Sequence, residues 1–137
     1  MTQPRTIDRD DLAALRVLSA GDVDGIPWMP LRGLTGVTQK VLWQAGDIVI
    51  GLIRVEGGHD KPAHAHDAAY HHIWIVSGSC TMVGQPLTAG AYVYVPPGVD
   101  HEVGDVGAEG CVYFYTHRPL QGHAVRGSAL ADAVSAE

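Results

Sequence analysis

The chain lacks several features that mark whole classes of protein. It has two cysteines among 137 residues, Cys80 and Cys111, too few for a disulfide framework in a chain of this size. No apolar run approaches the roughly 20 residues needed to span a bilayer. The nine lysines and arginines are dispersed, form no basic patch and leave a net charge of −6. These absences argue against a disulfide-rich secreted protein, a membrane-spanning protein and a nucleic-acid-binding surface.

The N-terminal residues also lack a hydrophobic stretch. The opening MTQPRTIDRDD is polar and charged, without the apolar segment of a secretory signal. We therefore expect a cytoplasmic protein with reduced thiols. The length suits one domain with a real core, and an apolar fraction of 46% is ordinary for a globular protein.

Most of the chain from residue 37 onward has the pattern of short β-strands. β-Branched and aromatic residues gather in runs bounded by Gly, Pro or Asp. The expected strands are VTQKVLW (37–43), DIVIGLIRVE (47–56), HIWIVSG (72–78), CTMV (80–83), AYVYV (91–95), HEVGDV (101–106) and CVYFYTH (111–117). Many short strands separated by turn residues indicate an all-β sandwich, jelly roll or barrel.

The two ends of the chain are expected to differ from this region. Asp10 and Asp11 precede LAALRVL and predict a short N-terminal helix that Gly21 ends. The C-terminal stretch lacks a sustained apolar face and is expected to be mobile. The predicted organisation is an N-terminal arm with first strands over residues 1–36, a barrel over 37–119 and a mobile tail over 120–137.

Four histidines lie within nine residues, in the stretch HAHDAAYHH from His64 to His72. His64 and His66 are two apart, so on a strand both side chains leave the same face and can bind one ion together. His71 and His72 are neighbours, so only one of them can point toward that face. Strand alternation alone does not say which.

The histidine stretch resembles the first sequence motif of the cupin family. His64, His66 and His71 stand at the motif's spacing between Gly58 and Gly78, except that His71 occupies the place usually held by a glutamate.

A second stretch, GAYVYVPPGVDH, resembles the second cupin motif. Gly90, Pro96, Gly98 and His101 are in place, and Asp105 replaces the terminal asparagine. The region from Trp28 to Leu42 is also similar to the cupin-like domain of ChrR-type anti-sigma factors.

The cupin resemblance implies a fold and a set of metal ligands. The fold is a jelly-roll barrel, or double-stranded β-helix, with a short N-terminal helix or extended arm. His64, His66 and His101 match the three histidine ligands of the family, and His71 makes a fourth. The implied cofactor is one divalent transition metal, with iron, manganese or zinc ahead of nickel or copper. Two alternatives stay open: a three-histidine site with His71 as a bystander, and a degenerate cupin without metal.

Other side chains are weaker candidates for the site. His72 is expected to face away or to support a ligand, and His59, His117 and His123 are expected to be solvated. Arg54 could bind a substrate carboxylate, although such a residue more often marks a strand end that reaches solvent. The tyrosine pairs at 92/94 and 113/115 could line a pocket, but core or interface packing is the more common role.

A four-histidine site predicts the charge of the ligand that a bound metal ion would take. Neutral imidazoles leave a divalent ion its full positive charge, which favours an anion such as an enolate. The function predicted first is a metal-dependent dioxygenase acting on a small enolisable diketone, enol or aromatic substrate. The alternatives are a polyketide cyclase or isomerase that uses the ion as a Lewis acid, and a non-enzymatic small-ligand binding or sensing cupin. The family resemblance and the apolar residues of the N-terminal third also suggest a homodimer, and we expect neither a nucleic-acid nor a membrane partner.

Overall fold

The computed structural model describes residues 15–64 and 69–120. Within these ranges a short helix, α2 (Ala20–Gly25), precedes the strands. The strands are β1 (Met29–Pro30), β2 (Val37–Ala45), β3 (Ile48–Val55), β4 (Lys61–His64), β5 (Ala69–Met82), β6 (Gln85–Thr88), β7 (Tyr92–Val95), β8 (His101–Val103) and β9 (Cys111–Pro119). The all-β prediction is confirmed.

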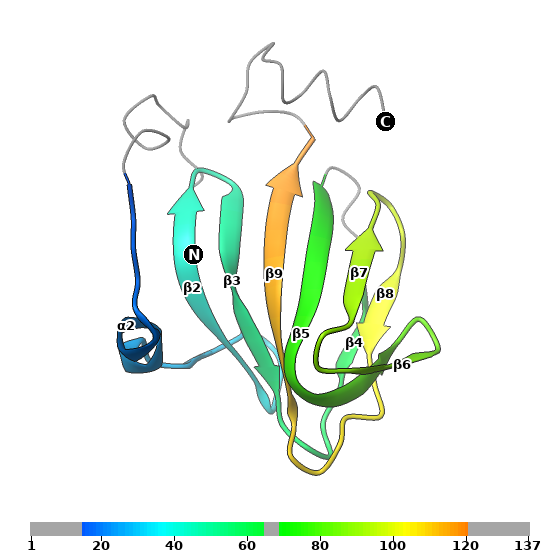
Figure 1. The fold of residues 1–137 in the computed structure, drawn as a ribbon. Helices are drawn as coiled ribbons and strands as arrows, with labels where there is room; N and C mark the ends of the chain where they lie inside the picture. The colour runs from blue at the N-terminus through cyan, green and yellow to red at the C-terminus, as the bar shows by residue number, and fades with distance from the viewer. Residues whose placement is uncertain (1–14, 65–68, 121–137) are drawn as a thin grey trace.

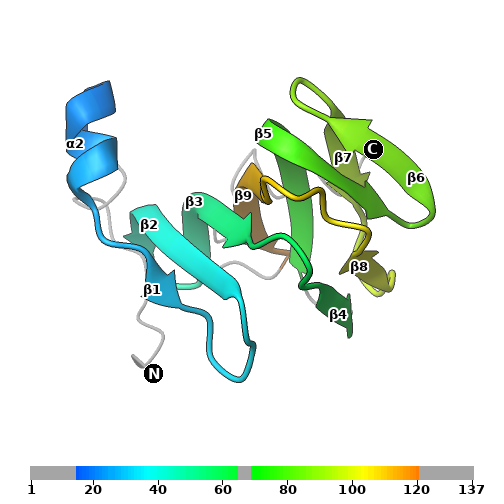
Figure 2. The same cartoon turned by 90° about the horizontal axis from the view of Figure 1, so that it is seen from below.

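The strands form a large antiparallel sheet and a small one. The large sheet has the order β1-β2-β3-β9-β5-β6, and β7 also pairs with β5. Strands β2, β3, β9 and β5 run side by side, with α2 at one end (Figure 1). The small sheet contains only β4 and β8 among the described strands, and these two lie next to each other in the view from below (Figure 2).

The core is formed by the inward-facing side chains of these strands. Strand β5 shows how alternation in the sequence places side chains in the core or on the surface. His71, Ile73 and Ile75 are buried, whereas Trp74 and Val76 between and after them are about half exposed, at 55% and 51%. This alternation is the period of two that a strand with one buried face requires. The main core cluster is Val37, Ile53, Val55, Ile73, Ile75, Cys80, Met82, Leu87, Val95, Val103, Cys111, Tyr113 and Tyr115. Both cysteines carry free thiols.

Strand β5 is longer than the sequence pattern predicts. Two strands were expected, at 72–78 and 80–83, but the structure has one continuous strand with an irregularity between Ile75 and Ser77 in its pairing with β9. Gly78 adopts φ +76°, so the strand bends there and does not end. A glycine inside a strand can mark such a bend as readily as a turn, which is why the prediction was wrong.

The structure also contains three strands whose bounds the sequence pattern does not give. These are β1, β4 and β6, and each contains a proline, which cannot donate to a sheet ladder. β4 pairs with β8 with a register shift between Lys61 and His64 that accommodates Pro62. Edge strands and shifted pairings of this kind tolerate proline.

The described part of the N-terminal segment differs from the helix predicted there. Residues 15–19 are not helical, and α2 includes Gly21, which was expected to end the helix. Ser19 begins it through a capping box, because its hydroxyl accepts from the Asp22 backbone N–H and the Asp22 carboxylate accepts from the Ser19 N–H. The earlier part of the predicted helix and all but the first residue of the predicted tail lie outside the described residues.

Strand β1 joins the N-terminal segment to the barrel by pairing with β2. The buried Lys40 side chain on β2 donates to the carbonyl of Val23 in α2 at 2.9 Å. In the part of the chain that the structure describes, no helix is long and apolar enough to cross a membrane.

Candidate functional site

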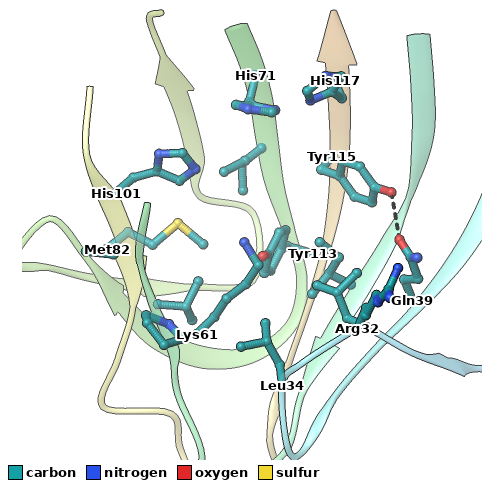
Figure 3. A pocket seen from close by; sticks show the side chains of 16 residues that line it. Arg32, Leu34, Gln39, Lys61, His71, Met82, His101, Tyr113, Tyr115 and His117 are labelled. Atoms are coloured by element: carbon teal, nitrogen blue, oxygen red, sulfur yellow. Dashed lines mark hydrogen bonds between the residues drawn. The ribbon is translucent and has the colours of Figure 1, made fainter. Parts of the chain in front are cut away.

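A cavity of about 420 Å³ lies between the large sheet and the β4–β8 pair (Figure 3). Its walls are mainly apolar, and its polar side chains come from both sheets and from the segment that follows β1. The described residues that line it are Leu31, Arg32, Leu34, Gln39, Ile53, Lys61, Pro62, Ala63, His71, Ile73, Met82, His101, Val103, Tyr113, Tyr115 and His117. A volume of this size suits a small organic ligand.

Three imidazoles stand around one part of this cavity. His71 on β5 and His117 on β9 are direct partners in the strand register, with ring centroids 5.0 Å apart. His101 on β8 comes from the opposite sheet, and its ring centroid is 5.5 Å from that of His71. His71 and His101 are each only 6% exposed. Of the two neighbours His71 and His72, His71 is therefore the one whose side chain faces the cavity.

The hydrogen bonds of His71 and His101 define which ring nitrogen can bind a metal. Nδ1 of His71 lies 3.0 Å from the carbonyl oxygen of Thr116, and Nδ1 of His101 lies 3.1 Å from that of Val99. A carbonyl only accepts, so in each ring Nδ1 carries the proton and donates. The neutral ring then keeps a lone pair on Nε2. This backbone support for a ligand histidine is what metal sites commonly use.

The electrostatics of His101 support the neutral form. The pKa of His101 is lowered, first by burial and also by the positive charge of Lys61. The hydrogen bond to Val99 and the charges of Glu102 and Asp100 oppose this shift but do not cancel it. Burial also lowers the pKa of His117, against the opposing effect of Asp47. Neutral imidazole is the form that binds a metal ion.

The spacing of His71 and His101 fits a shared ion. An imidazole bound through Nε2 at about 2.1 Å has its ring centre roughly 3 Å from the ion. Two such rings at right angles or somewhat wider stand about 4.5–5.5 Å apart. The observed 5.5 Å lies at the wide end of that range.

The other two predicted ligands are only partly described. His64 ends β4 and is the register partner of His101, but its side chain lies outside the description. His66 falls within residues 65–68, which are also outside it. Among the described side chains, no three donors of the His, Cys, Asp or Glu type gather closely enough to hold a metal ion. The four-histidine site remains a prediction. Two of its four residues, His71 and His101, line the same cavity.

His72 lies outside the cavity, on the outer face of β5. Its Nδ1 is 2.6 Å from the hydroxyl of Tyr92, and its ring lies near that of Tyr94. Its backbone N–H donates to the Thr116 hydroxyl at 3.0 Å. It therefore contributes to the sheet and not to the cavity.

Sequence reasoning missed several lining residues. His117 was expected to be solvated, but it is half-buried and lines the cavity. Its signal was available: it follows Tyr113 and Tyr115 at intervals of two, so all three share one face of β9. Arg54 is not among the lining residues; its guanidinium lies over the ring of Trp28, 4.6 Å from the centroid.

The remaining polar side chains of the described lining are two cations, two phenols and the amide of Gln39. Burial lowers the pKa of Lys61 to about 8. Burial raises the pKa of Tyr115 to about 12, and its hydroxyl donates to the Gln39 side-chain oxygen at 3.2 Å. Arg32 is exposed and lies at the rim. Within residues 15–64 and 69–120 no aspartate or glutamate is among the lining residues, so the charged side chains of this described lining are Lys61 and Arg32.

The fold agrees with the result of a family comparison. A family model described as the ChrR cupin-like domain matches residues 18–121, most of the chain. The chain belongs to this family of cupins. The resemblance read from the two motifs and from the region before them is thereby confirmed. No curated protein matches the chain.

Solved structures of this cupin's fold come from several organisms. An RmlC-like cupin from Shewanella frigidimarina shares 25% identity over 77% of this chain and 92% of its own, with a TM-score of 0.62. The complex of SigE with the anti-sigma ChrR from Rhodobacter sphaeroides gives 22% identity over 68% of this chain and 49% of that chain, with a TM-score of 0.57. A predicted oxalate decarboxylase from Thermotoga maritima gives 15% identity over 76% and 99%, with a TM-score of 0.62.

Proposed function

We propose that this cupin is a metal-dependent dioxygenase that acts on a small enolisable diketone or related substrate. The ion would be a divalent transition metal held by His64, His66, His71 and His101. The observation that carries the proposal is the pair of imidazoles, His71 and His101, that line one mainly apolar cavity from opposite sheets, each with its Nδ1 hydrogen-bonded to a backbone carbonyl. When bound, such an ion would polarise a chelating enolate and make it reactive toward oxygen.

The chain's own residues would provide the setting for this reaction. Thr116 and Val99 fix the tautomers of the two described histidines through their carbonyl oxygens. Apolar side chains such as Ile53, Ile73 and Val103 keep water away from the ligand. Because no carboxylate lines the described cavity, a bound enolate would meet no like charge there.

A sensing function is the second candidate, because the chain belongs to the ChrR cupin-like family. In that case the cavity would bind a small ligand without turning it over. The two candidates share the metal and the cavity, and they differ in whether a bound enolate reacts with oxygen.

Metal content and oxygen uptake test the proposal together. We expect protein purified without a histidine tag to contain about one transition metal ion per chain. His71→Ala should lose most of it, whereas the neighbouring His72→Ala should keep it, because His72 lies outside the cavity. Metal-loaded protein supplied with 2,4-pentanedione should consume one oxygen molecule per diketone cleaved, with both oxygen atoms entering the products. The measurements are elemental analysis and an oxygen electrode.

Three other outcomes would contradict all or part of the proposal. Equal metal content in the two variants would exclude His71 as a ligand. Diketone binding without oxygen uptake would contradict the dioxygenase and favour the sensing cupin. A wild-type chain that binds no transition metal would contradict both forms of the proposal.

A further inference from the structure

Tyr113 is a buried phenol in the cavity wall that the proposed metal site does not use. The residue is only 2% exposed, and its side chain points into the cavity on the far side of Tyr115 from His117 (Figure 3). Burial raises the pKa of Tyr113, so the phenol keeps its proton and remains a hydrogen-bond donor. Buried tyrosine hydroxyls usually have a hydrogen-bond partner.

The neighbouring Tyr115 shows that usual arrangement, and Tyr113 departs from it. The Tyr115 hydroxyl donates to the Gln39 side-chain oxygen at 3.2 Å. Within residues 15–64 and 69–120, no hydrogen bond involves the hydroxyl of Tyr113. Its oxygen is not sealed within the wall either, so a molecule in the cavity can reach it. A buried donor in this position is a candidate for binding a ligand.

An apolar stretch of the cavity separates this hydroxyl from the histidines. His117 and Tyr113 are four residues apart on β9, so about 13 Å of strand lies between the two ends. Ile73 pairs with Tyr115 between these ends, and both side chains line the cavity. The volume of about 420 Å³ is larger than a five-carbon diketone requires. A ligand that meets both ends therefore needs an apolar group between its two polar parts.

We propose that Tyr113 is a substrate-binding residue that donates a hydrogen bond to an acceptor atom at the far end of the substrate. The substrate would be an enolisable diketone that carries an aromatic ring with this acceptor, such as a carbonyl oxygen or a ring nitrogen. The diketone would lie toward His71 and His101, and the ring over Ile73 and Tyr115. This inference rests on the proposed function for the position of the diketone, whereas the hydrogen bond from Tyr113 requires no metal.

Two probes of the same shape test for the acceptor. They are 1-(pyridin-4-yl)butane-1,3-dione and 1-phenylbutane-1,3-dione, which differ only in the ring atom opposite the diketone, nitrogen or C–H. We expect the wild type to bind the pyridyl probe at least about fivefold more tightly, because the phenyl probe leaves the buried Tyr113 donor without a partner. Isothermal titration calorimetry at pH 7 without oxygen measures both affinities, in metal-loaded and in chelator-treated protein.

Two conservative variants assign the preference to Tyr113. Tyr113→Phe removes the hydroxyl and keeps the ring, so the preference should disappear or reverse, because the pyridyl nitrogen gives up its bond to water and gains none. The phenyl probe should bind this variant at least as tightly as the wild type, which shows that the cavity is intact. Tyr115→Phe is the matched control. It removes a hydroxyl that donates to Gln39, so it should keep the preference.

The outcomes distinguish this inference from the proposed function. A preference in chelator-treated protein that is lost in Tyr113→Phe supports the contact even if no metal binds and no oxygen is consumed. Equal binding of the two probes by the wild type, or binding of neither, overturns the inference without any variant. A preference that survives in Tyr113→Phe, or is lost equally in Tyr115→Phe, overturns it as well. A preference seen only in metal-loaded protein would mean that the pyridyl nitrogen binds the metal, which also overturns it.

Discussion

At the scale of single residues, Lys61 shows how partial burial acts on a charged side chain. Its pKa in the folded chain is about 8, against an ordinary value of 10.5, because burial disfavours the charged form. The folded state therefore holds its proton less tightly than the unfolded state. The resulting cost to stability is fully present below pH 8 and fades as the pH rises from 8 to 10.5.

Lys61→Met is expected to stabilise the metal-free protein at pH 7 by about 1–3 kcal/mol, since it removes this cost and keeps apolar packing. The gain should shrink toward pH 10. Urea unfolding at the two pH values measures it. A variant less stable than the wild type at pH 7 would show that Lys61 has a structural role instead.

The residue scale also shows how far the sequence determines the site. The motif spacing singles out His71 over His72, and the structure places His71 with His101 in one cavity. His117 and Lys61 belong to neither ligand pattern. Alternation along β9 places His117 on the same face as Tyr113 and Tyr115. Only the pairing of β9 with β5 and of β4 with β8 brings His117 and Lys61 to the other histidines, and such pairings between distant segments are not readable from local alternation.

At the scale of elements, Gly78 lies at the bend of β5, between the segment that pairs with β7 and the segment that pairs with β6. It adopts φ +76°, and a Cβ added there would lie 1.9 Å from the Gly110 carbonyl oxygen. Both the backbone angle and the close approach of Gly110, which directly precedes β9, therefore require glycine. Downstream of it, β5 pairs with β6, and upstream with β7.

Gly78→Ala is expected to lower the free energy of unfolding by about 2–4 kcal/mol, because the strained angle and the clash add. Gly84→Ala is the matched control. Gly84 has φ +74° but nothing within 4 Å of an added Cβ, so it should lose only about 1 kcal/mol. Chemical denaturation of both variants measures the difference. Equal losses would mean that contact with Gly110 imposes no constraint.

The elements also show what local sequence patterns leave out. The strands with clear alternation, β2, β3 and β9, were predicted within a few residues. Strand β4 was not, although it carries Lys61 and His64, because Pro62 and its small neighbour Ala63 lack a strand signal. It is ordered by pairing with β8, so an element of the site depends on a contact from a distant part of the chain.

At the scale of the whole molecule, the outer face of β5 and β7 is unusual for a surface. Trp74, Tyr92 and Tyr94 are exposed at 55%, 52% and 47%, and Val76 lies on the same face at 51%. The aromatic rings touch one another across the two strands. Large aromatic side chains gathered in this way are typical of protein interfaces. Among the described strands β7 pairs only with β5.

We predict that the homodimer suggested by the sequence forms through this face of β5 and β7. Light scattering should then give twice the chain mass of 14.5 kDa. Trp74→Glu should yield a monomer, since dimer formation would bury its charge without a partner. Met29→Glu places the same charge on β1, 55% exposed and at the other edge of the large sheet, so it should leave the dimer intact. Dissociation by Met29→Glu alone would move the interface to the N-terminal third, and a monomeric wild type would exclude the dimer.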